Sequence, residues 1–165
     1  MKIRPYSCDD WPDVEHIYTE GIATGLATFE TKPKTRHSWE GDSVPGSALV
    51  AEDTATKGIL GWAVLWPTSS RKAYAGVCEV SLYVGAQARG RGVGRLLLEE
   101  LVTVSEQLGI WTLQAGIFEE NTLSVSLHEK CGFRTVGVRE KIGILGSEWK
   151  NVILMERRSK VVGVQ

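Results

Sequence analysis

The sequence has little cysteine, no surplus of either charge and no long apolar run, and each shortage excludes a class of protein. Its three cysteines, Cys8, Cys78 and Cys131, are odd in number and never spaced Cys-x-x-Cys, so we expect reduced thiols and no metal site. The 19 basic and 20 acidic residues leave a net charge of -1, which gives no reason to expect nucleic acid or a membrane as a partner. No apolar run could span a bilayer and Met1–Tyr6 has no apolar signal region, so the cytoplasm is the expected location.

The 165 residues suit one domain with a sizeable core. We expect a single domain over residues 1–158 and a frayed tail over residues 159–165. Alternation and helical spacing of apolar residues predict the order strand, helix, helix, three strands, helix, strand, helix, two strands. The expected strands cover residues 2–6, 48–52, 59–66, 74–84, 111–118, 134–142 and 149–157, and the helices begin at Asp9 or Asp10, Lys34, Leu96 and Thr122.

This order of elements predicts the fold class. The strand–helix–strand unit from Glu79 to Phe118 requires a parallel crossover, whereas the short connections on either side of it require antiparallel pairing. The sum is an α+β fold with a mixed, largely antiparallel sheet of six to seven strands, a central parallel pair and about four flanking helices.

A glycine- and arginine-rich loop joins the strand that ends at Val84 to the helix that ends at Gly109. Glycines at alternate positions, Gly90-x-Gly92-x-Gly94, let a ligand approach the backbone, and the helix start offers unpaired N–H groups that suit a phosphate. The spacing is neither the dinucleotide fingerprint Gly-x-Gly-x-x-Gly nor a P-loop. The alternative interpretation is a tight strand-to-helix turn with solvated arginines.

Two motifs resemble the GNAT N-acetyltransferase superfamily. Gln87-x-x-Gly90-x-Gly92, directly after a strand, is similar to that superfamily's acetyl-CoA pyrophosphate loop. Asn121 opens a segment that ends in Gly132-Phe133 and resembles the part that follows the second parallel strand, where an asparagine meets the pantetheine arm. The resemblance implies a GNAT-type fold, acetyl-CoA as co-substrate and a cofactor site made of Leu82, Tyr83, Val84, Gln87, Arg89, Gly90, Arg91, Gly92, Val93, Gly94, Arg95, Asn121 and Ser124.

A narrower resemblance covers nearly the whole chain. Residues 27–31, 79–84 and 127–133 look like those of the phosphinothricin acetyltransferase family, whose relatives act on methionine sulfoximine and arsinothricin. The resemblance implies a homodimer and detoxification of a small glutamate-like amino acid by N-acetylation. The sequence departs from the family at residues 144–149, where many relatives carry Lys-Phe-Gly-Arg-Trp near the substrate.

Glu79 and His128 are the candidate catalytic residues. Acetyl transfer from a thioester needs a neutral amine and benefits from a proton on the leaving thiolate. Glu79, on the strand that leads into the glycine loop, is the candidate base, and the alternative is a carboxylate on the solvent face of the strand. The resemblance implies that His128 takes the place where many other GNATs carry a tyrosine, which makes it the candidate acid, and the alternative is a surface histidine.

The candidate substrate residues centre on Arg71, whose guanidinium can bind a carboxylate or phosphinate bidentately. Arg71 lies just upstream of the catalytic strand. Phe29 could instead belong to a loop that packs its ring into the core. The other residues expected at the substrate are Phe29, Glu30, Tyr74, Val80 and Ser81.

Three rival functions remain open at this stage, and one of them is a GNAT that acts on another small amine. A CoA-binding sensor that has lost catalysis would keep the phosphate loop but lack Glu79 and His128, and both are present. A GNAT that acts on protein N-termini or lysines would need an open, often acidic groove for a peptide. Arg71 and the Phe29-Glu30 pair favour a small anionic substrate instead.

Overall fold

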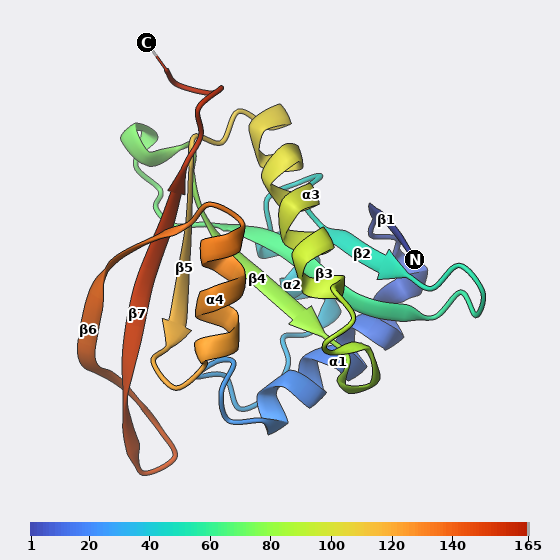
Figure 1. Ribbon diagram of the computed structural model, residues 1–165. Helices are drawn as coiled ribbons and strands as arrows, with labels where there is room; N and C mark the ends of the chain where they lie inside the picture. The colour runs from blue at the N-terminus through green and yellow to red at the C-terminus, as the bar shows by residue number, and fades with distance from the viewer. Residues whose placement is uncertain (165) are drawn as a thin grey trace.

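The computed structural model describes residues 1–164 and contains one seven-stranded sheet with helices on both faces (Figure 1). The strand order is β1-β2-β3-β4-β5-β7-β6. The strands are β1 (Lys2–Pro5), β2 (Leu49–Glu52), β3 (Ile59–Pro67), β4 (Val77–Val84), β5 (Thr112–Phe118), β6 (Arg134–Leu145) and β7 (Glu148–Arg158). The α-helices are α1 (Trp11–Ala23), α2 (Arg36–Asp42), α3 (Val93–Gln107) and α4 (Thr122–Lys130), with short 3-10 turns at Cys8–Asp10, Lys72–Tyr74 and Ala86–Ala88. The predicted mixed sheet with a central parallel pair is confirmed.

The parallel pair β4–β5 is bonded over only part of its length. Its register covers Val77 to Glu79 on β4 and Thr112 to Gln114 on β5. Beyond these residues the two strands diverge, as Figure 1 shows, while β4 stays paired with β3 and β5 with β7. The divergence leaves the inner edges of Val80–Val84 and Ala115–Phe118 without a neighbouring strand, and this opening positions the site.

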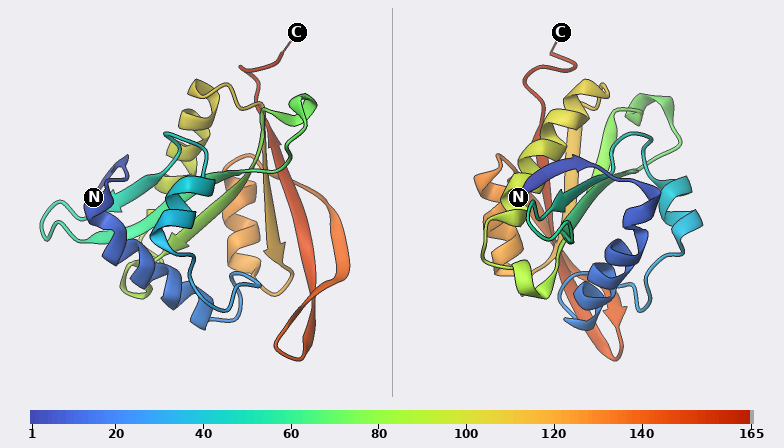
Figure 2. Two further views of the ribbon diagram at one scale, coloured as in Figure 1. Left: turned by 180° about the vertical axis from the view of Figure 1, so that it is seen from behind. Right: turned by 90° about the vertical axis from the view of Figure 1, so that its right-hand side faces the viewer.

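Each face of the sheet has its own core, because successive side chains of a strand point to opposite faces. Helices α1 and α2 cover one face and α3 and α4 the other (Figure 2). On β3, Trp62 and Val64 pack toward α1, whereas Ala63 and Leu65 pack toward α3. A large part of the first core is aromatic, with Trp62 stacked on Tyr83 at 4.6 Å between ring centroids.

Helix α3 begins at Val93 rather than at the expected Leu96, so Gly94 and Arg95 belong to its first turn and not to the loop. Gly92 is its N-cap with φ 79°, a left-handed conformation that favours glycine, and no side chain caps the helix. Buried Val93, Leu97 and Leu101 attach it to the sheet. The predicted glycine C-terminus is confirmed by Gly109, with φ 76°.

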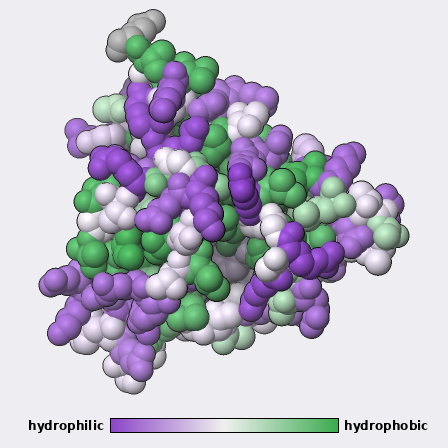
Figure 3. All heavy atoms as spheres, in the orientation of Figure 1, coloured by the Kyte–Doolittle hydropathy of each residue, from purple (hydrophilic) through white to green (hydrophobic). Residues whose placement is uncertain are grey.

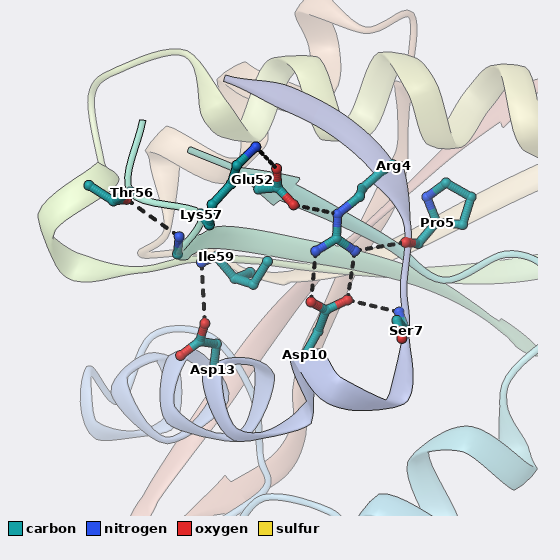
Figure 4. A network of polar contacts seen from close by, with 10 residues as sticks. Arg4, Pro5, Ser7, Asp10, Asp13, Glu52, Thr56, Lys57 and Ile59 are labelled. Atoms are coloured by element: carbon teal, nitrogen blue, oxygen red, sulfur yellow. Dashed lines mark hydrogen bonds and ion pairs between the residues drawn. The ribbon is translucent and has the colours of Figure 1, made fainter. Parts of the chain in front are cut away.

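A charged network fixes the N-terminal strand. The guanidinium of Arg4 donates to both carboxylate oxygens of Asp10 at 2.8 Å and to Glu52 at 2.7 Å, so it joins β1, the turn before α1 and β2 (Figure 4). These bonds lower the pKa of Asp10 from its ordinary value. Asp10 occupies the N-cap of α1, yet its carboxylate serves Arg4 and the backbone N–H of Ser7 rather than the helix.

Two predicted strand boundaries are wrong. The strand expected from residue 74 begins at Val77, because Lys72–Tyr74 forms a 3-10 turn and the backbone at Gly76 lies directly against the indole of Trp111. The strand expected to end at residue 142 continues to Leu145 across a bulge between Arg139 and Gly143. Inside the bulge, Lys141 has φ 46° and its N–H donates to Asn151 Oδ1 at 2.8 Å.

The described part of the tail contacts the body of the protein. Ser159 is buried, its hydroxyl donates to Glu106 at 2.9 Å and it accepts the N–H groups of Val161 and Val162. Arg158 donates to the carbonyl oxygens of Trp111 and Val162. The division into a domain over 1–158 and a tail that frays in solution stays a prediction, and Gln165 lies outside the described residues. Within residues 1–164, no helix has the length and apolarity needed to cross a bilayer.

Candidate active site

Two cavities occupy the opening between β4 and β5. One has a volume of 490 Å³ and lies along the glycine loop and the first turn of α3; we call it the cofactor cavity. The other has a volume of 310 Å³ and lies between β4, β5 and the β6–β7 hairpin; we call it the acceptor cavity. They share wall residues on three segments, namely Leu26, Ala27, Leu82, Tyr83, Asn121 and Ser124. A ligand in one cavity therefore lies next to a ligand in the other.

The cofactor cavity collects most of the residues that the glycine-loop resemblance implies. All of them line it except Gln87 and Arg91, which are exposed beside it. Gly90 and Gly92 both have positive φ, and a Cβ at either would meet no atom within 4 Å. Their N–H groups have no acceptor among the described residues and lie at the positive end of the α3 dipole. Glycine amides together with Arg89 and Arg95 fit a pyrophosphate such as that of acetyl-CoA.

Glu79 lines the acceptor cavity from β4, at the last residue pair before β4 and β5 separate. Strand alternation places it on the same face as Ser81 and Tyr83. It is exposed, and it has no hydrogen-bond or ion-pair partner among the described residues. A carboxylate at this point can accept a proton from an amine inside the cavity.

His128 lines the same cavity from α4, and it is not a surface residue. Its side chain is 4% exposed and packs edge-on against Phe133, with 5.0 Å between ring centroids. Its Nδ1 lies 2.8 Å from the carbonyl oxygen of Ser124, a group that can only accept, so Nδ1 carries the proton. Burial lowers the pKa of His128 from its ordinary 6.5, against a smaller raising effect of the bond to Ser124. The neutral ring thus offers Nε2 as a proton acceptor.

Asn121, which follows β5, connects the segment 26–29 to the start of α4 through hydrogen bonds. Its Oδ1 accepts the N–H of Ser124 and caps α4, while its Nδ2 donates to the carbonyl oxygen of Leu26, both at 3.2 Å. Phe29 then packs edge-on against Phe118 at 4.7 Å, and its ring lies against the backbone of Gly143 on β6. Residues 26–29 thus form one wall of the acceptor cavity and join α1 to the β6–β7 hairpin.

The residues expected at the substrate are divided by the structure. Phe29, Val80 and Ser81 line the acceptor cavity, and Ser81 accepts a hydrogen bond from the indole of Trp66 at 2.8 Å. Glu30, Arg71 and Tyr74 line neither cavity. Arg71 is exposed on the turn before β4, with its guanidinium 5.5 Å from the ring of Tyr74.

Sequence reasoning missed Arg139, the cationic side chain that does line the acceptor cavity. Ile142 and Val152 line it from the same hairpin. No local motif marks these residues, because their position depends on the pairing of β6 with β7 and on the bulge between Arg139 and Gly143.

A splayed parallel pair with a glycine loop at the helix that follows defines the class of protein, an acetyl-CoA-dependent N-acetyltransferase. The chain belongs to the acetyltransferase (GNAT) family, whose sequence model matches residues 9–133. The chain is 31% identical to a phosphinothricin N-acetyltransferase of Streptomyces coelicolor over 95% of both chains, and 35% identical to one of Alcaligenes faecalis over 94% of this chain and 81% of that one. It is 25% identical to an L-methionine sulfoximine/L-methionine sulfone acetyltransferase of Pseudomonas paraeruginosa over 93% of this chain and 92% of that one.

Solved structures agree with this assignment. A phosphinothricin acetyltransferase from Sinorhizobium meliloti in complex with acetyl-CoA has a TM-score of 0.87 and 28% identity, over 99% of this chain and 91% of that one. A ribosomal-protein-alanine N-acetyltransferase from Brucella melitensis has a TM-score of 0.89 and 28% identity, over 96% of this chain and all of that one. The predicted family and fold class are therefore confirmed, and the fold neighbours differ in their named acceptors.

The buried neutral imidazole of His128 predicts a pH-dependent stability. The pKa of His128 is lower in the folded than in the unfolded state. Its contribution to the free energy of unfolding is therefore fully present above the unfolded pKa, and it is lost as the pH falls from there through the folded pKa. We expect the free energy of unfolding to fall between roughly pH 7 and pH 5.5, above the range where carboxylates titrate. The free energy of unfolding can be measured by urea denaturation at several pH values in this range. It should change less steeply with pH in His128→Gln than in wild type. His16→Gln, at an exposed position, is the control, and equal slopes for His128→Gln and wild type would contradict the prediction.

Proposed function

We propose that this protein transfers the acetyl group of acetyl-CoA to the α-amino group of a small glutamate-analogue amino acid, of the phosphinothricin, arsinothricin or methionine sulfoximine type. Acetylation would remove the charge of the amine and so detoxify the compound, giving resistance, and we place this activity in the cytoplasm. The observation that carries the proposal is the acceptor cavity. It has a volume of 310 Å³, it is lined by Glu79, His128 and Arg139, and it adjoins the cofactor cavity.

The reaction forms a C–N bond and breaks the C–S bond of the thioester, and the ammonium loses two protons overall. One proton ends on the leaving thiolate and the other in solvent. Glu79 takes the proton that frees the lone pair of the amine. The inner edge of β4 near Leu82–Val84 has no strand partner, so a backbone N–H there can polarise the thioester carbonyl. Binding the amine and thioester in adjoining cavities supplies much of the rate by proximity.

We propose that His128 acts first as a base, whereas the sequence analysis expects it to act as an acid. With Nδ1–H held by Ser124, the neutral ring has no proton on Nε2 to give. It lines the acceptor cavity rather than the cofactor cavity. His128 therefore accepts the second proton of the amine during attack, and only then holds a proton that it can pass toward the thiolate.

Steady-state acetylation assays test the proposed function. Acetyl-CoA should support turnover of phosphinothricin, methionine sulfone or methionine sulfoximine, and much less turnover of peptides with a free N-terminal alanine. The peptide arm addresses the rival suggested by the Brucella melitensis neighbour. Turnover of the peptides alone would replace the proposal by a protein N-terminal acetyltransferase, and binding of acetyl-CoA without any turnover would indicate a sensor.

We also propose a homodimer, formed through the β6–β7 hairpin. Strand β6 is the edge of the sheet, and its apolar side chains remain exposed, as does Trp149 on β7 at 58%. Figure 3 shows apolar residues gathered on the side of the molecule where the hairpin lies. An edge strand with such a surface favours pairing with a second copy. The exposed apolar residues of β6 are Val136, Val138, Ile142 and Ile144.

The dimer can be tested by sedimentation velocity. Wild type should sediment as a dimer at micromolar concentration, and Val138→Glu should produce monomers because it places a charge in the apolar face. Leu108→Glu, at an exposed apolar position near the end of α3, is the control and should stay dimeric. A monomeric wild type, or a dimer unaffected by Val138→Glu, would contradict this interface.

A further inference from the structure

Among the arginines whose side chains have no hydrogen-bond or ion-pair partner in the described chain, Arg139 is the one that lines the acceptor cavity. Arg4, Arg95 and Arg157 each pair with a carboxylate, and Arg158 donates to backbone carbonyl oxygens. Within residues 1–164, Arg139 makes no hydrogen bond or ion pair, yet it lines the acceptor cavity. Five N–H donors in a fixed fork are thus available to a ligand there.

The sheet register places Arg139 level with Phe118 on β5, further along that strand than Gln114, the residue that pairs with Glu79. Phe118 on β5 pairs with Val152 on β7, which pairs in turn with Arg139 on β6. Residues in register on neighbouring strands share one face, and all three line the acceptor cavity. Glu79 lines it from β4, on the other side of the opening between β4 and β5. The cavity therefore has a carboxylate on one wall and a guanidinium on the other.

The charges of the cavity match one particular kind of acceptor. Glu79 and Arg139 are the only charged side chains that line it in the described chain, and the buried ring of His128 is neutral. A zwitterionic α-amino acid offers one ammonium and one carboxylate, and it satisfies both. A second acid group, such as the phosphinate of phosphinothricin, would find no second cation on these walls to offset its charge.

We propose that Arg139 binds the α-carboxylate of the acceptor, and that the cavity selects amino acids whose side chain ends in an uncharged polar group over those with a second acid group. The inference rests on the proposed function and narrows its substrate class. The α-carboxylate is held bidentately by the guanidinium, which directs the amine toward Glu79. The side chain is then left against apolar and neutral polar walls, where a sulfone or sulfoximine fits better than a phosphinate.

A paired comparison of enzyme and substrate variants tests this. Arg139→Gln should raise KM for methionine sulfone by roughly 10–100-fold, because charge-assisted bonds to the carboxylate are lost, while KM for acetyl-CoA stays unchanged. With the α-carboxamide of methionine sulfone, which has no carboxylate, wild type and Arg139→Gln should have equal kcat/KM. Arg71→Gln, an exposed arginine that lines neither cavity, is the matched control and should behave as wild type. Wild type should also have a higher kcat/KM for methionine sulfone than for phosphinothricin.

The outcomes separate this inference from the proposed function. If wild type turns over methionine sulfone but Arg139→Gln matches it, or if Arg71→Gln alone raises KM, Arg139 is not the anchor and the proposed function still stands. If wild type has a higher kcat/KM for phosphinothricin than for methionine sulfone, the cavity does not select acceptors that lack a second acid group, and that part of the inference is wrong. If wild type acetylates no amino-acid analogue at all, the proposed function fails and this inference fails with it.

Discussion

Replacing Glu79 by glutamine should lower kcat by about 10²–10⁴-fold, the usual contribution of a general base, and leave KM for acetyl-CoA nearly unchanged. Glutamine keeps the size and hydrogen-bonding capacity of the side chain but cannot accept the proton of the ammonium. Because Glu79 lines only the acceptor cavity, the cofactor cavity is left intact. A loss confined to kcat would indicate that the interaction is made in the transition state rather than in both bound states.

A rise in pH should partly restore the Glu79→Gln variant. As the pH approaches the pKa of the substrate's amine, more of the amine is already neutral and the base becomes dispensable. The matched control is Glu30→Gln, because Glu30 lies one residue beyond the wall segment 26–29 and lines neither cavity. Normal turnover of Glu79→Gln at neutral pH would mean that Glu79 is structural, and a defect that is equal at every pH would exclude a role in proton transfer.

The parts of the fold that the sequence predicted are those fixed by local rules. Helical spacing located α3 and α4, and glycines with positive φ, Gly109 and Gly132, ended them as expected. Of the alternating glycines, Gly90 and Gly92 lie in the predicted loop and have the left-handed conformation that glycine adopts at low cost, whereas Gly94 lies inside α3. A chain order with one parallel crossover was sufficient to predict the mixed sheet.

The boundaries and residues that were missed depend on contacts between distant segments. The start of β4 is set by the indole of Trp111 against Gly76, which no periodicity within residues 72–84 reveals. The opening between β4 and β5 follows from pairing that stops at Glu79 and Gln114. Arg139 enters the acceptor cavity through its register with Val152. Proximity in sequence to β4 predicts Arg71 at the substrate, but the turn at residues 72–74 leaves it outside the acceptor cavity.

The second large effect is expected at Gly92, whose replacement by valine should weaken acetyl-CoA binding by roughly 10–100-fold, the value of one charge-assisted hydrogen bond to a phosphate. A Cβ at Gly92 would meet no atom within 4 Å, so the cost is conformational: φ is 79°, a region that is strongly disfavoured for a β-branched residue. The loop must then change its backbone and turn its N–H groups away from the pyrophosphate.

Two companion variants distinguish this backbone effect from a loss of stability or charge. Gly92→Asn should bind acetyl-CoA better than Gly92→Val, because asparagine tolerates the left-handed conformation. Arg91→Ala should weaken binding only mildly, because Arg91 does not line the cofactor cavity. Calorimetric titration of folded protein, checked by circular dichroism, measures all three. If Gly92→Val binds acetyl-CoA with wild-type affinity, or if Asn and Val have the same effect, the backbone of this loop does not hold the pyrophosphate.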